Sequence, residues 1–149
     1  MSKSATLTGR WYIKLYGENG EFKDSREGQN VITETGLSFL ASFLQSATVT
    51  ASTFVMNQIA IGTDATAEAA SNTALGTESA RTTGTASYVS NAVYRVTATF
   101  PSATGTGAVV EYGLFSTAAA GTMMSRDTEA AINKGANDIL VVTTEITLA

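Results

Sequence analysis

Carboxylates are the first side chains to consider for chemistry, because the 149 residues include thirteen Asp and Glu but no His and no Cys. Without His or Cys the usual nucleophilic triads cannot form, and composition leaves only a Ser–Lys pair open. Hydrolysis of a glycoside needs two carboxyl groups set across a cleft. Glu34 with Glu78 and Glu111 with Asp127 are candidate pairs, but acidic side chains are ordinarily solvated. We therefore predict that the protein is not an enzyme and has no catalytic residue.

Two further segments contain residue types that bind ligands in other proteins. Asp64 and Glu68 supply the hard oxygens that Ca²⁺ prefers, but the alternating acids and terminal Glu of an EF-hand loop are missing. Gly105-Thr106-Gly107 lacks the Gly-Lys-Ser/Thr ending of a phosphate-binding loop. We interpret the first segment as a surface loop and the second as a turn, and we predict no bound metal and no cofactor.

Charge and hydrophobicity limit the classes of partner. The net charge is −4, and the nine Lys and Arg are scattered along the chain, whereas binding of nucleic acid needs them concentrated. No apolar segment is long enough to span a membrane, and the first residues do not form a signal peptide, which predicts a protein made and kept in a cytoplasm. Charged residues are only 15% of the chain, so the surface suits contact with another protein.

The elements that would position these residues are mainly β-strands. Trp11, Ile13 and Leu15 alternate with polar or aromatic neighbours, and the same period of two recurs between residues 92 and 148 with Gly-rich spacers. We predict about eight strands, at residues 9–16, 22–28, 54–61, 81–88, 92–100, 109–115, 122–126 and 139–148.

One segment has the period of a helix instead. Between residues 35 and 46, the side chains of Leu37, Phe39, Leu40, Phe43 and Leu44 fill an arc of about 160° at about 100° per residue. This predicts a short amphipathic helix, with Thr33 or Thr35 as its N-cap. We predict a linker at residues 47–53 and a surface loop at residues 62–76.

These elements predict an all-β protein with one short amphipathic helix. The length suits one domain, and two sheets packed face to face would bury the apolar strand faces. We therefore predict a flexible N-terminal arm at residues 1–8 and a single β-sandwich domain at residues 9–149. The arm is a candidate contact element for a partner.

Three aromatic residues near the N-terminus are candidates for an interface. Trp11, Tyr12 and Tyr16 would form an exposed anchor, because aromatic side chains concentrate at the energetic centres of interfaces. Alternatively, Trp11 belongs to the core and the two tyrosines flank it.

Three isolated arginines in predicted strands are the other interface candidates. Arg81, Arg95 and Arg126 would form ion pairs between subunits. Alternatively, each pairs within its own chain with an acid such as Glu111 or Asp127.

Several short motifs follow one another along most of the chain: Asn30-Val31-Ile32, Gly36-Leu37, Ile59-Ala60-Ile61-Gly62-Thr63, Thr73-Ala74-Leu75, Arg81, Glu111-Tyr112-Gly113-Leu114-Phe115, Ser125-Arg126 and Lys134. Their order resembles that of small virion proteins of tailed bacteriophages, among which are capsid cement or decoration proteins and proteins of tail fibres and collars.

The resemblance implies a β-sandwich of jelly-roll type that assembles as a homo-oligomer, a dimer or a trimer. It implies a cement protein that binds the major capsid protein on the outer surface of the virion capsid and stabilises the head after synthesis in the cytoplasm of the host bacterium. Two alternatives stay open. One is a tail-fibre, collar or other tail-associated structural protein, and the other is a carbohydrate-binding module, whose exposed aromatic residues would stack on sugars.

Overall fold

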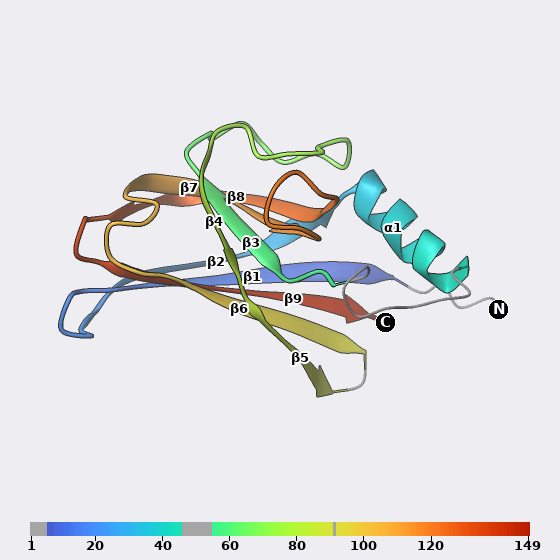
Figure 1. The fold of residues 1–149 in the computed structure, drawn as a ribbon, viewed down its shortest axis with the longest axis horizontal. Helices are drawn as coiled ribbons and strands as arrows, with labels where there is room; N and C mark the ends of the chain where they lie inside the picture. Colours follow the sequence, from blue (N-terminus) through green and yellow to red (C-terminus); the bar gives the residue numbers. More distant parts are fainter. Residues whose placement is uncertain (1–5, 46–54, 91) are drawn as a thin grey trace.

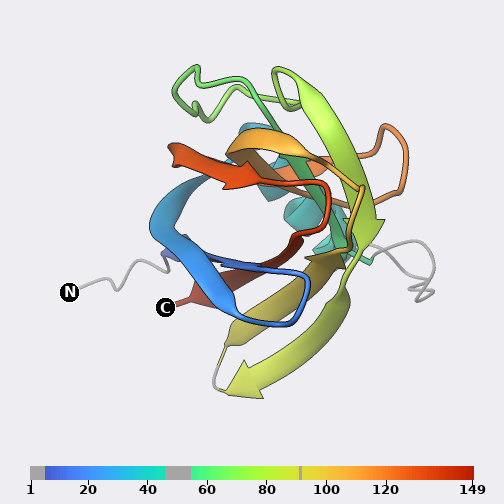
Figure 2. The same ribbon diagram turned by 90° about the vertical axis from the view of Figure 1, so that its left-hand side faces the viewer.

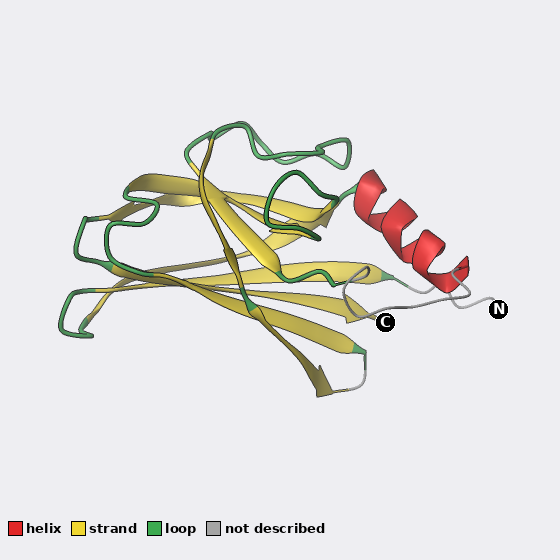
Figure 3. Ribbon diagram, in the orientation of Figure 1, coloured by secondary structure: helices red, strands yellow, loops and turns green. Residues whose placement is uncertain are grey.

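The computed structural model describes residues 6–45, 55–90 and 92–149. In these ranges the chain forms nine strands and one helix (Figures 1 and 3). They are β1 (Leu7–Tyr16), β2 (Phe22–Ile32), α1 (Glu34–Gln45), β3 (Gln58–Gly62), β4 (Glu78–Thr83), β5 (Thr85–Ser90), β6 (Val93–Phe100), β7 (Gly107–Phe115), β8 (Met123–Lys134) and β9 (Ile139–Leu148).

Hydrogen bonds join all nine strands in one antiparallel sheet with the order β4-β3-β7-β8-β2-β1-β9-β6-β5. The sheet is curled, so that its two halves face each other with the core between them (Figure 2). One half contains β1, β9, β6 and β5, and the other contains β8, β7, β3 and β4. The first and last strands of the described residues, β1 and β9, are neighbours near the middle of one half.

The chain passes between the two halves at two corners. At the first corner β2 pairs with β1 along most of its length but with β8 only at Val31 and Ile32. At the second corner only Gly84 separates β4 from β5, and these strands belong to opposite halves. A Cβ atom on Gly84 would lie 2.6 Å from Val96 Cγ1 and 2.9 Å from the Thr97 carbonyl oxygen. The close approach of the chain at this corner therefore requires glycine.

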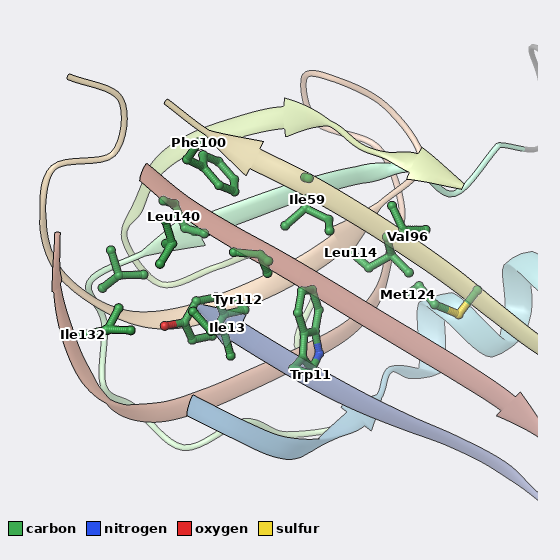
Figure 4. Packing of buried hydrophobic residues seen from close by; sticks show 14 of the residues in the cluster. Trp11, Ile13, Ile59, Val96, Phe100, Tyr112, Leu114, Met124, Ile132 and Leu140 are labelled. Atoms are coloured by element: carbon green, nitrogen blue, oxygen red, sulfur yellow. The ribbon is translucent and has the colours of Figure 1, made fainter. Parts of the chain in front are cut away.

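The core lies between the halves, where the alternation of each strand directs its apolar side chains. The rings of Trp11 on β1 and Tyr112 on β7 have their centroids 6.1 Å apart (Figure 4). On β9, Leu140, Val142 and Ile146 are buried, as their spacing predicts. Apolar contact between strands far apart in the sequence is therefore the main stabilising interaction of the fold.

The helix α1 begins where the sequence predicts. Thr33 is the N-cap, since its Oγ1 accepts a hydrogen bond from the Gly36 N–H at 3.0 Å. Gly36 is buried against β8, where a Cβ atom would lie 2.7 Å from the Met124 carbonyl oxygen. The predicted apolar arc is only partly covered in the described residues: Leu37 and Leu44 are exposed, Leu44 by 85%.

The all-β class and the single short helix are confirmed, and nine strands replace the eight predicted. The difference arises at residues 81–88, where Gly84 divides one predicted strand into β4 and β5. β8 extends to Lys134, well beyond the predicted strand 122–126. β1 begins at Leu7, so the last two residues of the predicted arm belong to a strand that pairs with β9. The rest of the arm up to residue 5, and the predicted linker, lie outside the described residues.

Candidate functional site: the outer face of β1, β9 and β6

Three of the predicted interface residues lie together on the outer surface of the sheet. Because Trp11, Ile13 and Leu15 point into the core, the alternation of β1 turns its other side chains outward. β9 and β6 follow β1 in the sheet and add their own outward side chains. We call this surface the β1–β9–β6 face. It is a shallow hollow lined by Tyr12, Lys14, Tyr16, Arg95, Thr97, Val141, Thr143 and Glu145.

The middle of the β1–β9–β6 face is a row of aligned side chains. Tyr12 lies opposite Thr143 on β9, and Thr143 lies opposite Thr97 on β6. The Oγ1 atoms of the two threonines are 3.0 Å apart and share a hydrogen bond. Such cross-strand pairs hold side chains in fixed positions, so the row is a preformed surface of one aromatic ring and two hydroxyl groups.

Ion pairs neutralise the charges at one end of the face. The Arg95 guanidinium donates a hydrogen bond from Nε to Glu145 Oε1 at 2.8 Å, and a second, shorter one from Nη2. Next to it, Arg10 Nη2 lies 3.0 Å from Glu27 Oε1, and its guanidinium carbon lies 5.8 Å from the centre of the Tyr12 ring. The face therefore combines aromatic area with paired charges of both signs, a composition that suits a protein partner.

The other end of the face is aromatic. Tyr16 and Phe22 pack edge to face with ring centroids 6.2 Å apart, across the hairpin between β1 and β2. Phe22 is 61% exposed, although it begins a strand. This large exposed ring extends the apolar area next to Tyr16, and the sequence interpretation did not select it.

Trp11 is not part of this surface. Its side chain is fully buried, so the prediction of an exposed anchor is wrong for Trp11, and the alternative, a core residue flanked by Tyr12 and Tyr16, is correct. The physical reason is the strict alternation of β1, which sends neighbouring side chains to opposite faces.

Arg81 is also outside the face, because it fixes a loop. Its guanidinium lies 3.7 Å from the centre of the Phe115 ring and forms two hydrogen bonds with the Glu78 carboxylate. Its Nη1 donates to the carbonyl oxygens of Thr117 and Ala120 at 2.9 and 2.7 Å. These contacts give Arg81 a structural role within its own chain, the alternative that the sequence left open, and its role as an intersubunit contact stays a prediction.

Arg126 is buried in an ion pair with Glu111, one of the acids that the sequence offers as its partner. The distance from Arg126 Nη2 to Glu111 Oε2 is 2.9 Å. The Glu111 carboxylate also accepts hydrogen bonds from backbone N–H groups of the 63–77 loop, those of Asp64, Gly76 and Thr77. This carboxylate holds the loop to the sheet. Arg126 itself is only 2% exposed, so its ion pair with Glu111 lies beneath the surface.

A cluster of carboxyl groups was not predicted. Asp127 is buried and faces the core side of β8, and burial together with the nearby charges of Glu129 and Glu68 raises the pKa of Asp127 to about 7. Gly28 makes room for these groups, because a Cβ atom there would lie 1.7 Å from Glu129 Oε1. The spacing Asp127-x-Glu129 is the available sequence signal, since residues two apart share a face of a strand.

Among the described residues, no three acidic, His or Cys side chains are arranged to hold a metal ion. Asp64 accepts hydrogen bonds from the N–H and hydroxyl of Thr66, and Glu68 accepts one from the Thr128 hydroxyl. Within residues 6–45, 55–90 and 92–149, the one helix falls short of the length needed to cross a membrane.

Comparison of the chain with protein-family models, with curated proteins and with solved structures finds no match. The function is therefore inferred from the β1–β9–β6 face and from the sequence.

Proposed function

We propose that the protein is a virion structural protein: a capsid cement or decoration protein that binds the major capsid protein on the outer surface of the head and stabilises it. The observation that supports this proposal is the position of Tyr12, Tyr16 and Arg95 on one accessible sheet face. Rigid aromatic side chains and arginine are the residues that contribute most to protein interfaces. We take the particle to be a phage virion because the sequence resembles small phage virion proteins.

A cement protein needs no reaction. Anything that binds the assembled shell but not its free subunits shifts the equilibrium toward the shell, and many copies acting together add avidity to a weak single site. The β1–β9–β6 face suits this role because cross-strand pairs hold its side chains in place before binding, which lowers the entropic cost of association.

The finer description of the fold belongs to this proposal. We propose that the two halves of the curled sheet are the two layers of the β-sandwich of jelly-roll type that the phage resemblance implies. The contact between Trp11 and Tyr112 across the core supports this description, since the two rings come from opposite halves.

Two other functions follow from particular observations. The exposed Phe22 ring beside Tyr16 would equally serve a tail or collar component, where the partner is another structural protein. The row formed by Tyr12, Thr143 and Thr97 places hydroxyl groups beside an aromatic ring, and this favours a carbohydrate-binding module as the third candidate.

The test is binding of the purified protein to purified phage heads, tails and a glycan array. We expect saturable binding to heads, and we expect Tyr12→Ala combined with Tyr16→Ala to weaken it at least about tenfold, because truncation of central aromatic residues commonly costs about 2 kcal/mol or more. Leu44→Ala, a change of an exposed apolar residue on α1, is the control and should bind like the wild type.

Quantitative mass spectrometry of purified virions measures the copy number. A number equal to that of the major capsid protein, or a simple fraction set by the lattice, supports the cement role. A few to a few dozen copies would transfer the assignment to the tail or collar. Binding to glycans alone would favour the carbohydrate-binding module, and absence from virions would refute the virion function.

A further inference from the structure

The curled sheet has two edges that differ in how they are protected. At one edge β4 contains the Glu78–Arg81 ion pair, and Arg81 holds the 116–121 loop over this side through hydrogen bonds to Thr117 and Ala120. At the other edge β5 pairs with β6 and with no other strand in the described chain. Charges and covering loops are the means by which proteins prevent edge strands from pairing with other chains.

The β5 strand has neither a charged residue nor a covering loop among the described residues. Its sequence, Thr-Ala-Ser-Tyr-Val-Ser, contains no charge and no proline. All six residues are exposed, Tyr88 by 75%, and the register irregularity against β6 occurs only between Tyr88 and Ser90. Figures 1 and 2 show β5 along the border of the molecule, with β6 on one side only. Thr, Tyr and Val favour strands through contacts with neighbouring strands, and among the described residues β5 has such a neighbour on one side only.

We propose that β5 pairs with β5 of a second copy of this chain, antiparallel and related by a two-fold axis. A copy is the occupant that β5 fits best, because one symmetric contact covers the exposed edges of both chains at once. In such a pair two identical strands lie opposite each other, so a charged residue near the axis would face its own copy and be repelled by it. β5 contains no charged residue. This inference is independent of the proposed function.

Side-chain size fixes the register. Directly opposed residues of an antiparallel pair lie on the same face of the sheet, so the axis must pass through a residue of β5. An axis at Ser87 places Ala86 opposite Tyr88 of the partner copy, so that a small side chain faces a large one. Both side chains lie on the same face of the sheet as Tyr94, which is opposite Tyr88 on β6. The sheet then continues from β1, β9, β6 and β5 of one copy into the same strands of the other.

A cysteine on the axis tests this geometry, because the chain has no native Cys. In Ser87→Cys the two sulfur-bearing residues would be directly opposed, with Cα atoms about 4.5–5.5 Å apart, which is within the range of about 4.4–6.8 Å that a disulfide spans. We expect mild oxidation to convert this variant to a covalent dimer. Thr85→Cys is the matched control on the same strand, and its Cα atoms would be more than about 13 Å apart at a rise of about 3.4 Å per residue.

Sedimentation velocity then measures the uncrosslinked proteins. We expect the wild type to sediment as a dimer, and Ser87→Lys to raise the dissociation constant of the dimer at least about tenfold, because it places two like charges opposite each other. Asn133→Lys, the same new side chain at an exposed position of β8, should remain dimeric. Circular dichroism checks that both variants are folded.

Three results would overturn the inference: a wild type that is monomeric at tens of micromolar, a dimer that Ser87→Lys leaves unchanged, or equal crosslinking of the Ser87→Cys and Thr85→Cys variants. A monomer that still binds heads would leave the proposed function intact, and a dimer that does not bind heads would leave the β5 contact intact.

Discussion

Two buried acidic residues of neighbouring strands have opposite environments. Glu111 accepts hydrogen bonds from three backbone N–H groups and from Arg126, which compensates the cost of its burial. Asp127 has no such set of donors; its neighbours include two further carboxyl groups, those of Glu129 and Glu68. Burial of an ionised carboxylate in that environment is unfavourable, so Asp127 ties the stability of the fold to pH.

We predict that the free energy of unfolding decreases as pH rises from about 4 to about 7. The pKa of Asp127 is about 7 in the folded protein against 3.8 for the unperturbed side chain, so the folded state holds a proton that the unfolded state releases. At about 1.4 kcal/mol per pKa unit, the loss approaches about 4 kcal/mol at pH 8. Asp127→Asn, which cannot ionise, should be more stable than the wild type at pH 8 and lose most of this pH dependence. Urea unfolding at pH 5 and pH 8 measures both effects.

Glu18→Gln is the control for this prediction, because Glu18 is an exposed acid in the first hairpin and its replacement makes the same change in charge. It should leave the pH dependence of the wild type in place. A wild type that is equally stable at pH 5 and pH 8 would contradict the role of Asp127.

At the scale of elements, Gly84 decides whether the sheet can curl. It joins β4 to β5 at the corner between the two halves, with Val96 Cγ1 and the Thr97 carbonyl at 2.6 and 2.9 Å from the position of a Cβ atom. Because one of these contacts is with backbone, the strain cannot be relieved by a side-chain rotation alone.

We therefore predict that Gly84→Ala destabilises the protein by about 1–3 kcal/mol, the usual cost of overpacking, and weakens the contact between β5 and β6. Urea unfolding measures the first effect, and amide hydrogen exchange of β5 measures the second. Thr85→Ala, at the next residue and exposed, should change stability by less than about 0.5 kcal/mol. A Gly84→Ala protein as stable as the wild type would show that the corner has room.

Elements with a clear period could be predicted from the sequence, and those without one could not. β9 matches its predicted bounds, since its buried residues Leu140, Val142, Thr144 and Ile146 recur at every second position. β8 was predicted too short, because its second half contains Ala130, Ala131 and other residues that do not alternate. This second half pairs with the first residues of β7, the preceding strand in the chain.

The candidate site was predictable only in part, for a related reason. Once Trp11 is in the core, Tyr12 and Tyr16 must face outward, so the alternation of one strand is sufficient to predict their position. Arg95 joins them only because β9 lies between β1 and β6. That order is set by packing of segments distant in sequence, and no local pattern reports it. For the same reason Arg126 and Arg95 look alike in the sequence, although Arg126 is buried and Arg95 is partly exposed.

At the scale of the whole molecule, the last strand completes the fold. β9 lies between β1 and β6 and provides buried side chains along its length. Without it, β1 and β6 would lose their shared neighbour, and backbone groups on both would lose their hydrogen bonds. The pairing of β1 with β9 joins residues far apart in the sequence, and such non-local contacts slow folding.

We predict that deletion of residues 139–149 abolishes cooperative folding, and that the separate 139–149 peptide restores it. The protein contains a single Trp, which is buried and lies opposite Thr144 of β9. Its fluorescence should shift to longer wavelength in the truncated protein and return to the native wavelength when the peptide is added. A peptide with Val142→Lys is the matched control and should fail, because it would bury a charge in the core.

The deletion experiment shows whether the two halves of the sheet fold together or separately. If the truncated protein keeps native fluorescence and a cooperative urea transition, the half of the sheet formed by β8, β7, β3 and β4 is stable without β9, and the molecule is not one cooperative unit. If only the wild-type peptide restores both signals, the two halves fold together, because each buries its apolar face only against the other. In that case the β1–β9–β6 face forms only after β9 has been synthesised, since β9 is the central strand of that face.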